Sequence, residues 1–276
     1  MAHNSRPSKS RPSKSRPSKS RPSKMGRKWT QDDVLAYNIK VVYEDLTTFF
    51  GVTDLPPPNV ENDALTALPA QHSNAAHSHS ISNMLFYMGR LATNPVPHIF
   101  NIESLTIQFV KELFSLFHYE DVKKGRFVMT RPTLGYMESQ GRPPQLDICI
   151  RDISHAILLV VKADRRSRGF NPEPRLISDA IGAFHNDNIM REKHLGIDPL
   201  TSMVMPGIVM HGTMPTFYKI PITPELVRAV ESGERPEQET VVHAYHPEVP
   251  RPEEGMKPLD NRSILLSCFE CFRQFL

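Results

Sequence analysis

The stretch QLDICIRDISHAILLVVKADRR, residues 145–166, decides the fold of this chain. It reads as two short β-strands joined by a turn, over 145–151 and 156–163. The second strand is apolar almost throughout, which is typical of a central strand that is buried on both faces. Asp147 lies on the first strand, and Lys162 and Asp164 end the second. The stretch therefore predicts a pair of sheet strands that carries two carboxylates and one lysine.

The segments around this pair alternate between helical and strand patterns. Helices are expected over 30–51, 81–92, 101–118, 174–195, 223–233 and 259–275, and further strands over 126–131, 134–138, 203–211 and 216–222. This order predicts an α/β (α+β) fold with a mixed central sheet flanked by helices. The arrangement matches the αβββαβ core of restriction-endonuclease-like proteins, with extra N- and C-terminal helices.

The chain divides into a short basic tail and one globular domain. Residues 5–24 are four copies of Ser-Arg-Pro-Ser-Lys, in which regular prolines exclude a helix and no apolar residue is available for burial. We expect 1–28 to be disordered and 29–276 to form a single nuclease-like domain with a flexible linker at about 55–80. The tail is interpreted either as an expanded repeat without a role or as a functional segment. A functional tail would be a nuclear-import or polyanion-binding arm, or a kinase target through its serines.

The net charge of +3 hides an asymmetry between these two parts. Ten of the 33 Lys/Arg lie in 1–28, which leaves 23 against all 30 Asp/Glu, so the body carries −7. An acidic body binds nucleic acid poorly unless its basic residues cluster. Any nucleic-acid contact is therefore expected from the tail, through its repeated basic residues. These are Arg6, Lys9, Arg11, Lys14, Arg16, Lys19, Arg21 and Lys24.

Other compositional features favour an intracellular protein of the cytoplasm or nucleus. Three cysteines suit a reduced protein better than a disulfide scaffold. No apolar run is long enough for a membrane span, and no apolar leader is visible, so no membrane role is expected. Cys268 and Cys271 lie within a helical pattern and are expected to pack in the core rather than bind zinc. Protein partners cannot be read from these patterns.

The charged residues of the opening stretch resemble the PD-(D/E)xK motif of metal-dependent nucleases, but in a different order. In that motif residues i and i+2 project from one strand face, roughly 7 Å apart, so that two carboxylates can ligate Mg²⁺ beside a lysine. Asp147 fits the first position. The triplet Lys162-Ala163-Asp164 has its charges exchanged, and taking Lys162 as the lysine puts Val160 in the acidic position.

Three interpretations of this arrangement stay open. The charges are solvated or form an inactive site, the site binds without cleaving, or a rearranged active site uses Asp147, Lys162 and Asp164 as catalytic residues. In the last case Mg²⁺ would be held by Asp147 and Asp164, with Glu103 at the start of the preceding helix as an outer carboxylate.

From Arg27 onward the chain resembles a family of uncharacterised proteins abundant in mushroom-forming (basidiomycete) fungi. The segments that carry the resemblance cover about nine-tenths of the chain. They are KWTQDDVLAYNIKVVYEDLTTFFGV, LDICIRD, AILLVVKADRR, PEPRLISDAIGAFHNDN, GIDPLTSMVMPGIVMHGTMPTFYKIPIT and GMKPLDNRSILLSCFECFRQF.

The resemblance implies a restriction-endonuclease-like core in which the second strand usually carries Glu-x-Lys. Lys162 then replaces the Glu, Asp164 replaces the Lys, Asp147 matches the first Asp, and Arg175 stands where a Gln is common. The implied function is that of a catalytically impaired nuclease relative with a degenerate active site, able to bind nucleic acid. The alternatives are a non-enzymatic interaction or scaffold protein and an active Mg²⁺-dependent nuclease with a rearranged site.

Overall fold

The computed structural model describes residues 29–92, 101–135, 144–154, 156–163 and 171–276. The tail over 1–28, for which disorder is expected, lies outside these residues, and so does Asp164. The predictions for the tail and for Asp164 therefore stay predictions.

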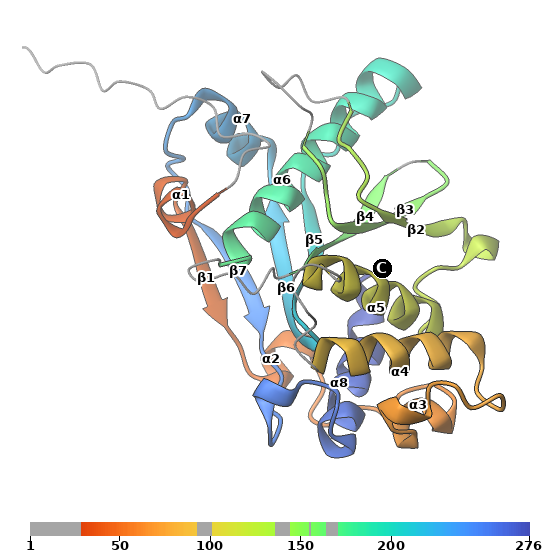
Figure 1. Ribbon diagram of the computed structural model, residues 1–276. Coiled ribbons are helices and arrows are strands. Elements are labelled where there is room, and N and C mark those ends of the chain that lie inside the picture. Colours follow the sequence, from red (N-terminus) through yellow and green to blue (C-terminus); the bar gives the residue numbers. More distant parts are fainter. Residues whose placement is uncertain (1–28, 93–100, 136–143, 155, 164–170) are drawn as a thin grey trace, which may run out of the picture.

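A seven-stranded mixed sheet in the order β1-β7-β6-β5-β4-β3-β2 forms the centre of the structure (Figure 1). Two neighbouring pairs are parallel, β1 with β7 and β4 with β5, and the other four pairs are antiparallel. The expected mixed sheet flanked by helices is confirmed. The strands are β1 Ile39–Tyr43, β2 Arg126–Thr130, β3 Ile148–Asp152, β4 Ile157–Ala163, β5 Met203–His211, β6 Met214–Ile222 and β7 Thr240–Tyr245.

Helices cover both faces of this sheet. One face packs on α6 with α1 and α7, and the other packs on α4, α5 and α8 (Figure 1). A π-helical turn over 191–195 continues α6. The α-helices are α1 Gln31–Ala36, α2 Leu46–Phe50, α3 Asn62–Thr66, α4 His79–Ala92, α5 Ile102–Leu116, α6 Glu173–Met190, α7 Pro224–Ser232 and α8 Leu259–Phe272.

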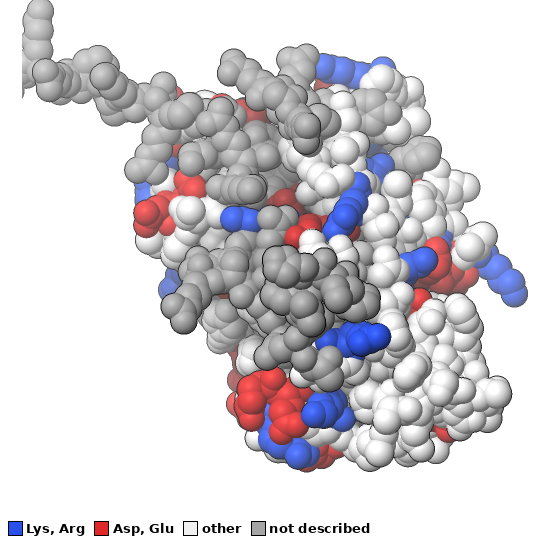
Figure 2. All heavy atoms as spheres, viewed as in Figure 1, with Lys and Arg blue, Asp and Glu red and all other residues white. Residues whose placement is uncertain are grey.

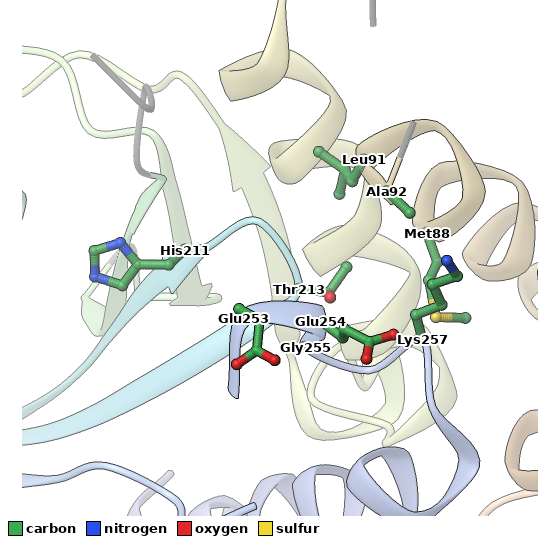
Figure 3. Close-up of a pocket in the computed structure, with 9 residues that line it drawn as sticks. All are labelled: Met88, Leu91, Ala92, His211, Thr213, Glu253, Glu254, Gly255 and Lys257. Atoms are coloured by element: carbon green, nitrogen blue, oxygen red, sulfur yellow. The ribbon is translucent and has the colours of Figure 1, made fainter. Parts of the chain in front are cut away.

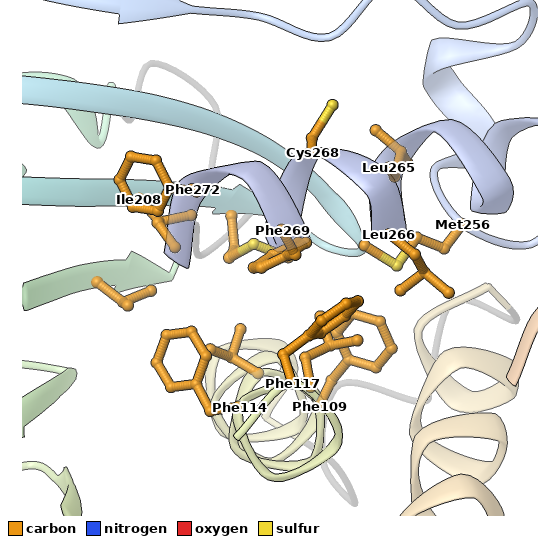
Figure 4. Close-up of a cluster of buried hydrophobic side chains, with 14 of the residues drawn as sticks. Phe109, Phe114, Phe117, Ile208, Met256, Leu265, Leu266, Cys268, Phe269 and Phe272 are labelled. Atoms are coloured by element: carbon orange, nitrogen blue, oxygen red, sulfur yellow. The ribbon is translucent and has the colours of Figure 1, made fainter. Parts of the chain in front are cut away.

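The core between the sheet, α5 and α8 is rich in aromatic side chains (Figure 4). The Phe117 and Phe269 rings stack with centroids 6.1 Å apart, and Phe217 of β6 meets Phe269 edge-on at 5.2 Å. Such pairs stabilise a core beyond the area they bury. Cys268 and Cys271 are free and buried here, so the expected packing role is confirmed.

The helix expected over 30–51 is wrong, because the structure divides this segment into α1, β1 and α2. Asn38 has a left-handed φ of 54° and separates α1 from β1. The following Ile-Lys-Val-Val-Tyr segment suits a strand, since β-branched and aromatic residues pack well on a pleated surface. Its partner β7 lies within residues 236–258, a proline-rich stretch for which no strand was expected. The long-range pairing of β1 with β7 therefore overrides the helical pattern of this segment.

The segment at about 55–80, for which a flexible linker is expected, carries regular elements and packs on α8. This segment contains α3, a 3-10 turn over 69–71 (η1) and the start of α4. Its Ala64 is fully buried, and the guanidinium of Arg262 in α8 donates to the carbonyls of Ala64 and Ala67 at 3.4 and 2.5 Å. The backbone is therefore tied to α8 by an arginine that lies 198 residues later.

The arrangement of the elements around β4 positions the candidate site. Strands β2, β3 and β4 form an antiparallel meander, α6 crosses one face, and β5 returns parallel to β4. The strand expected over 134–138 falls partly outside the described residues, and only an isolated bridge joins Thr133 to Gln145 there. Because the meander is antiparallel, one end of the sheet brings together the carboxyl ends of β2 and β4 and the amino end of β3.

Candidate functional site

Asp147 and Lys162 come together because their strands are neighbours. Asp147 directly precedes β3, and Lys162 is the penultimate residue of β4, whose Val161 pairs with Ile148. Side chains alternate between sheet faces, so Lys162 shares the face of Val160, which packs against α6. The helix α6 supplies the third member of the cluster, Asp179.

The ammonium of Lys162 lies between two carboxylates. Its Nζ is 3.1 Å from Asp147 Oδ1 and 3.0 Å from Asp179 Oδ2. The other Asp147 oxygen, Oδ2, accepts the backbone N–H of Ala163 at 2.9 Å. The exposed fractions of the side chains are 7% for Lys162, 8% for Asp147 and 17% for Asp179, so the three charges are largely removed from water.

Burial and the neighbouring charges shift the proton affinities in this cluster. Burial lowers the pKa of Lys162, but the carboxylates of Asp179 and Asp147 outweigh it and the pKa is raised. Burial raises the pKa of Asp179 to about 6, with Lys162 opposing the rise and Asp147 adding to it. Lys162 is therefore a fixed cation at neutral pH, whereas Asp179 takes up a proton just below neutrality.

Glu103 lies at the same end of the sheet but has a different partner. The Asn101 side chain caps α5 by accepting the backbone N–H of Glu103 at 2.9 Å. Glu103 therefore lies in the first turn of the helix. Glu103 Oε1 is 3.9 Å from Arg131 Nη2, and the backbone N–H of Arg131 donates to the backbone carbonyl of Asp147 at 2.8 Å. Glu103 thus approaches the cluster through Arg131.

Asp179 was not among the predicted site residues, which lie on the two strands or, for Glu103, at the start of α5. Its signal is visible in retrospect: Leu176 and Ala183 lie three residues before and four residues after it, on the buried face of α6. An acid on such an apolar face needs a cation nearby. The spacing alone could not show which cation that is, since α6 and β4 meet only in the folded sheet.

The described residues form no Mg²⁺ site of the kind that a rearranged active site would need, and its expected second ligand, Asp164, lies outside them. Mg²⁺ requires oxygen ligands in near-octahedral geometry. Both oxygens of Asp147 are already engaged, one by Lys162 and one by the Ala163 N–H. In the part of the chain that the structure describes, no group of three or more His, Cys, Asp and Glu side chains is placed to hold a metal ion.

Two hollows lie on the α4 side of the molecule, and the described lining of neither includes the cluster. The first, about 250 Å³, is bordered by the end of α4 and the turn at 253–257, with Glu254 and Lys257 near Thr213 (Figure 3). The second is an apolar groove of about 580 Å³ beside η1. On the face drawn in Figure 2, the described Lys and Arg side chains are dispersed among acidic ones and form no continuous basic surface.

No family model and no curated protein matches this chain. Among the described helices, none combines the length and the apolar composition that crossing a membrane requires.

Proposed function

We propose that this protein is a restriction-endonuclease-like protein of the cytoplasm or nucleus that binds nucleic acid and has lost metal-dependent cleavage. The observation that carries the proposal is the position of the Lys162 ammonium between Asp147 and Asp179. A built-in cation there supplies the positive charge that a divalent metal would supply in an active nuclease.

The order of elements supports the nuclease-like origin. Helix α5, the meander β2-β3-β4, helix α6 and the parallel strand β5 follow one another as in an αβββαβ core. Asp147 stands at the start of the second strand of this meander and Lys162 at the end of the third. Fold alone does not determine function, so the chemistry of the site has to decide what the protein does.

That chemistry disfavours hydrolysis. Metal-dependent phosphodiester cleavage uses a cation to polarise the phosphate and to generate hydroxide from bound water. An ammonium ion can attract a phosphate but has no open coordination position for water. Because Lys162 is already paired with two acids, it cannot act as a free base either.

Binding is proposed to come mainly from the tail. Its ten Lys/Arg are not balanced by any acid, while the body carries −7. Each phosphate neutralised by such a tail releases counterions, so affinity should fall steeply with salt. The acidic body and the dispersed charges of Figure 2 favour the second candidate, a non-enzymatic interaction protein without a nucleic-acid ligand.

Fluorescence anisotropy and a gel cleavage assay with labelled single- and double-stranded oligonucleotides test the proposal on the full chain. We expect the logarithm of the binding constant to fall linearly with the logarithm of the salt concentration, with a slope of roughly −4 to −7. No cleavage is expected in Mg²⁺ or Mn²⁺. Replacing the eight basic residues of the repeats with Gln should remove most of the binding. Absence of binding by the natural chain at low salt would favour the interaction-protein alternative.

The cleavage arm needs its own controls, because a trace contaminant can mimic activity. Asp147→Ala and the double exchange Lys162→Glu with Asp164→Lys are purified and assayed beside the natural chain. Cleavage by the natural chain that disappears in Asp147→Ala would overturn the loss of catalysis and favour the rearranged active site. Cleavage that appears only in the double exchange would support the proposed origin.

A further inference from the structure

The apolar groove beside η1 is a feature that the proposed function does not use. It lies between the turn η1, Pro69–Gln71, and the outer face of the last turns of α4, and it encloses about 580 Å³. That volume is within the range of small-molecule sites, roughly 300–1,000 Å³. The lining residues are Leu68, Pro69, Ala70, His72, Phe86, Gly89, Arg90, Ala92 and Lys257.

The shape of the groove follows from a glycine and a proline. Gly89 of α4 faces Pro69, and a Cβ at position 89 would lie 3.4 Å from the Pro69 Cβ. The absence of a side chain at this helical position leaves the groove open along the helix. Leu68 contributes an apolar side chain that is 50% exposed.

The Phe86 ring forms one wall of the groove and orients the polar groups around it. The His72 ring meets Phe86 edge-on with centroids 5.4 Å apart, and the Arg90 guanidinium lies 5.4 Å from the same ring. His72 Nδ1 is within 3.0 Å of the Pro69 carbonyl, which holds the imidazole at the rim. The wall is therefore apolar, with basic groups at its edge.

The charges of the lining residues have one sign. His72, Arg90 and Lys257 are basic, and none of the lining residues is acidic. Lys257 also borders the neighbouring hollow, where the acids of this region, Glu253 and Glu254, are found (Figure 3). A ligand in the groove therefore meets apolar side chains together with basic groups and no acidic lining residue.

We propose that this groove binds an amphipathic monoanion, namely a monomeric aliphatic carboxylate. The alkyl chain lies along Leu68, Phe86 and the open side of Gly89. The carboxylate meets Arg90 and Lys257, where an ionised acceptor forms stronger hydrogen bonds than a neutral one. This inference does not depend on the proposed nucleic-acid function.

Isothermal titration calorimetry of the full chain with decanoate, kept below its micelle concentration, tests the proposal. Decylammonium, which has the same chain and the opposite charge, is the matched ligand control. We expect one decanoate per chain and binding at least tenfold weaker for decylammonium. The basic tail also attracts anions, so the variants that decide the result are all placed in the groove.

Gly89→Leu fills the groove and replaces a helical glycine with a strong helix former, so the fold should persist. We expect this variant to lose decanoate binding at least tenfold while its thermal unfolding stays within a few degrees of the natural chain. The double change Arg90→Gln with Lys257→Gln should bring the decanoate and decylammonium affinities together. Decanoate binding that survives Gly89→Leu, or equal affinity of the natural chain for both ligands, would overturn the proposal. The absence of any decanoate binding would also overturn the proposal, and it is the result expected if another segment or a second copy of the chain covers the groove.

Discussion

Replacing Lys162 with Met is the most direct perturbation of the charge cluster. Met keeps the length of the apolar stem and removes the ammonium that is 3.1 Å from Asp147 Oδ1 and 3.0 Å from Asp179 Oδ2. At an effective dielectric constant of about 20, each contact has a gross attraction of roughly 5 kcal/mol. Desolvation of the three charges offsets much of this, and breaking a buried pair costs about 3–5 kcal/mol net.

We therefore expect Lys162→Met to lower the free energy of unfolding by about 3–5 kcal/mol at pH 7.5, measured by urea titration. This is a large part of the 5–15 kcal/mol that typically separates folded from unfolded chains. The loss should be smaller at pH 5, because Asp179, whose pKa is already raised to about 6, then carries a proton and needs no counter-charge.

The triple variant Lys162→Met, Asp147→Asn, Asp179→Asn is the matched control. It removes both carboxylates together with the ammonium, so most of the lost stability should return. A loss below about 1 kcal/mol in Lys162→Met, or the same loss in the triple variant, would refute the reasoning. The first result would mean that the ion pairs contribute little, and the second that the loss does not come from carboxylates left without a counter-charge.

Two further predictions concern pH and the buried arginine. The pKa of Asp179 is raised from 3.8 to about 6, so the folded state holds this proton more tightly, and stability should fall as pH rises from about 4 to 7. Asp187, raised to about 6 by burial, adds to this fall, and Asp179→Asn should remove roughly half of it in urea titrations across that range. Arg262→Met should cost about 3 kcal/mol, because Arg262 is fully buried and satisfies backbone carbonyls that would be left unpaired. The control is Arg228→Met, because the Arg228 side chain forms an ion pair with Glu225 while about 70% exposed. It should change stability by less than about 0.5 kcal/mol. Equal losses in the two variants would contradict the proposed role of burial.

Elements with a strong local pattern were predictable from the sequence. The apolar run of β4, the amphipathic repeat of α5 and the turn between β5 and β6 each carry their own signal, and the structure places them within a few residues of the expectation. The prediction for the segment over 30–51 was wrong because the spacing of its apolar residues suits a helix, whereas its β-branched residues suit a strand. Only the pairing of β1 with β7 resolves that conflict, and this pairing joins residues about 200 positions apart.

The candidate site was predictable only in part, for the same reason. Asp147 and Lys162 lie on adjacent strands of a meander, so their proximity follows from a short hairpin that the sequence indicates. Asp179 reaches Lys162 from a helix that crosses the sheet, and the path of that crossing is set by packing over the whole α6 face. Whether Lys162 would be solvated or enclosed could not be decided from the charges on two strands.

The sequence by itself determined how charge and apolar residues are distributed along this protein. It gives an acidic body, a basic repeat, and an apolar strand pattern that leads into Lys162. It also indicated the elements that carry a strong local pattern, such as β4 and α5, because hydrophobic periodicity and turn residues act over short distances. Only the tertiary structure decided which acids meet that lysine, since electrostatic partners are chosen by three-dimensional packing rather than by spacing along the chain. The enclosed Asp147–Lys162–Asp179 cluster is therefore a property of the folded sheet and α6 together.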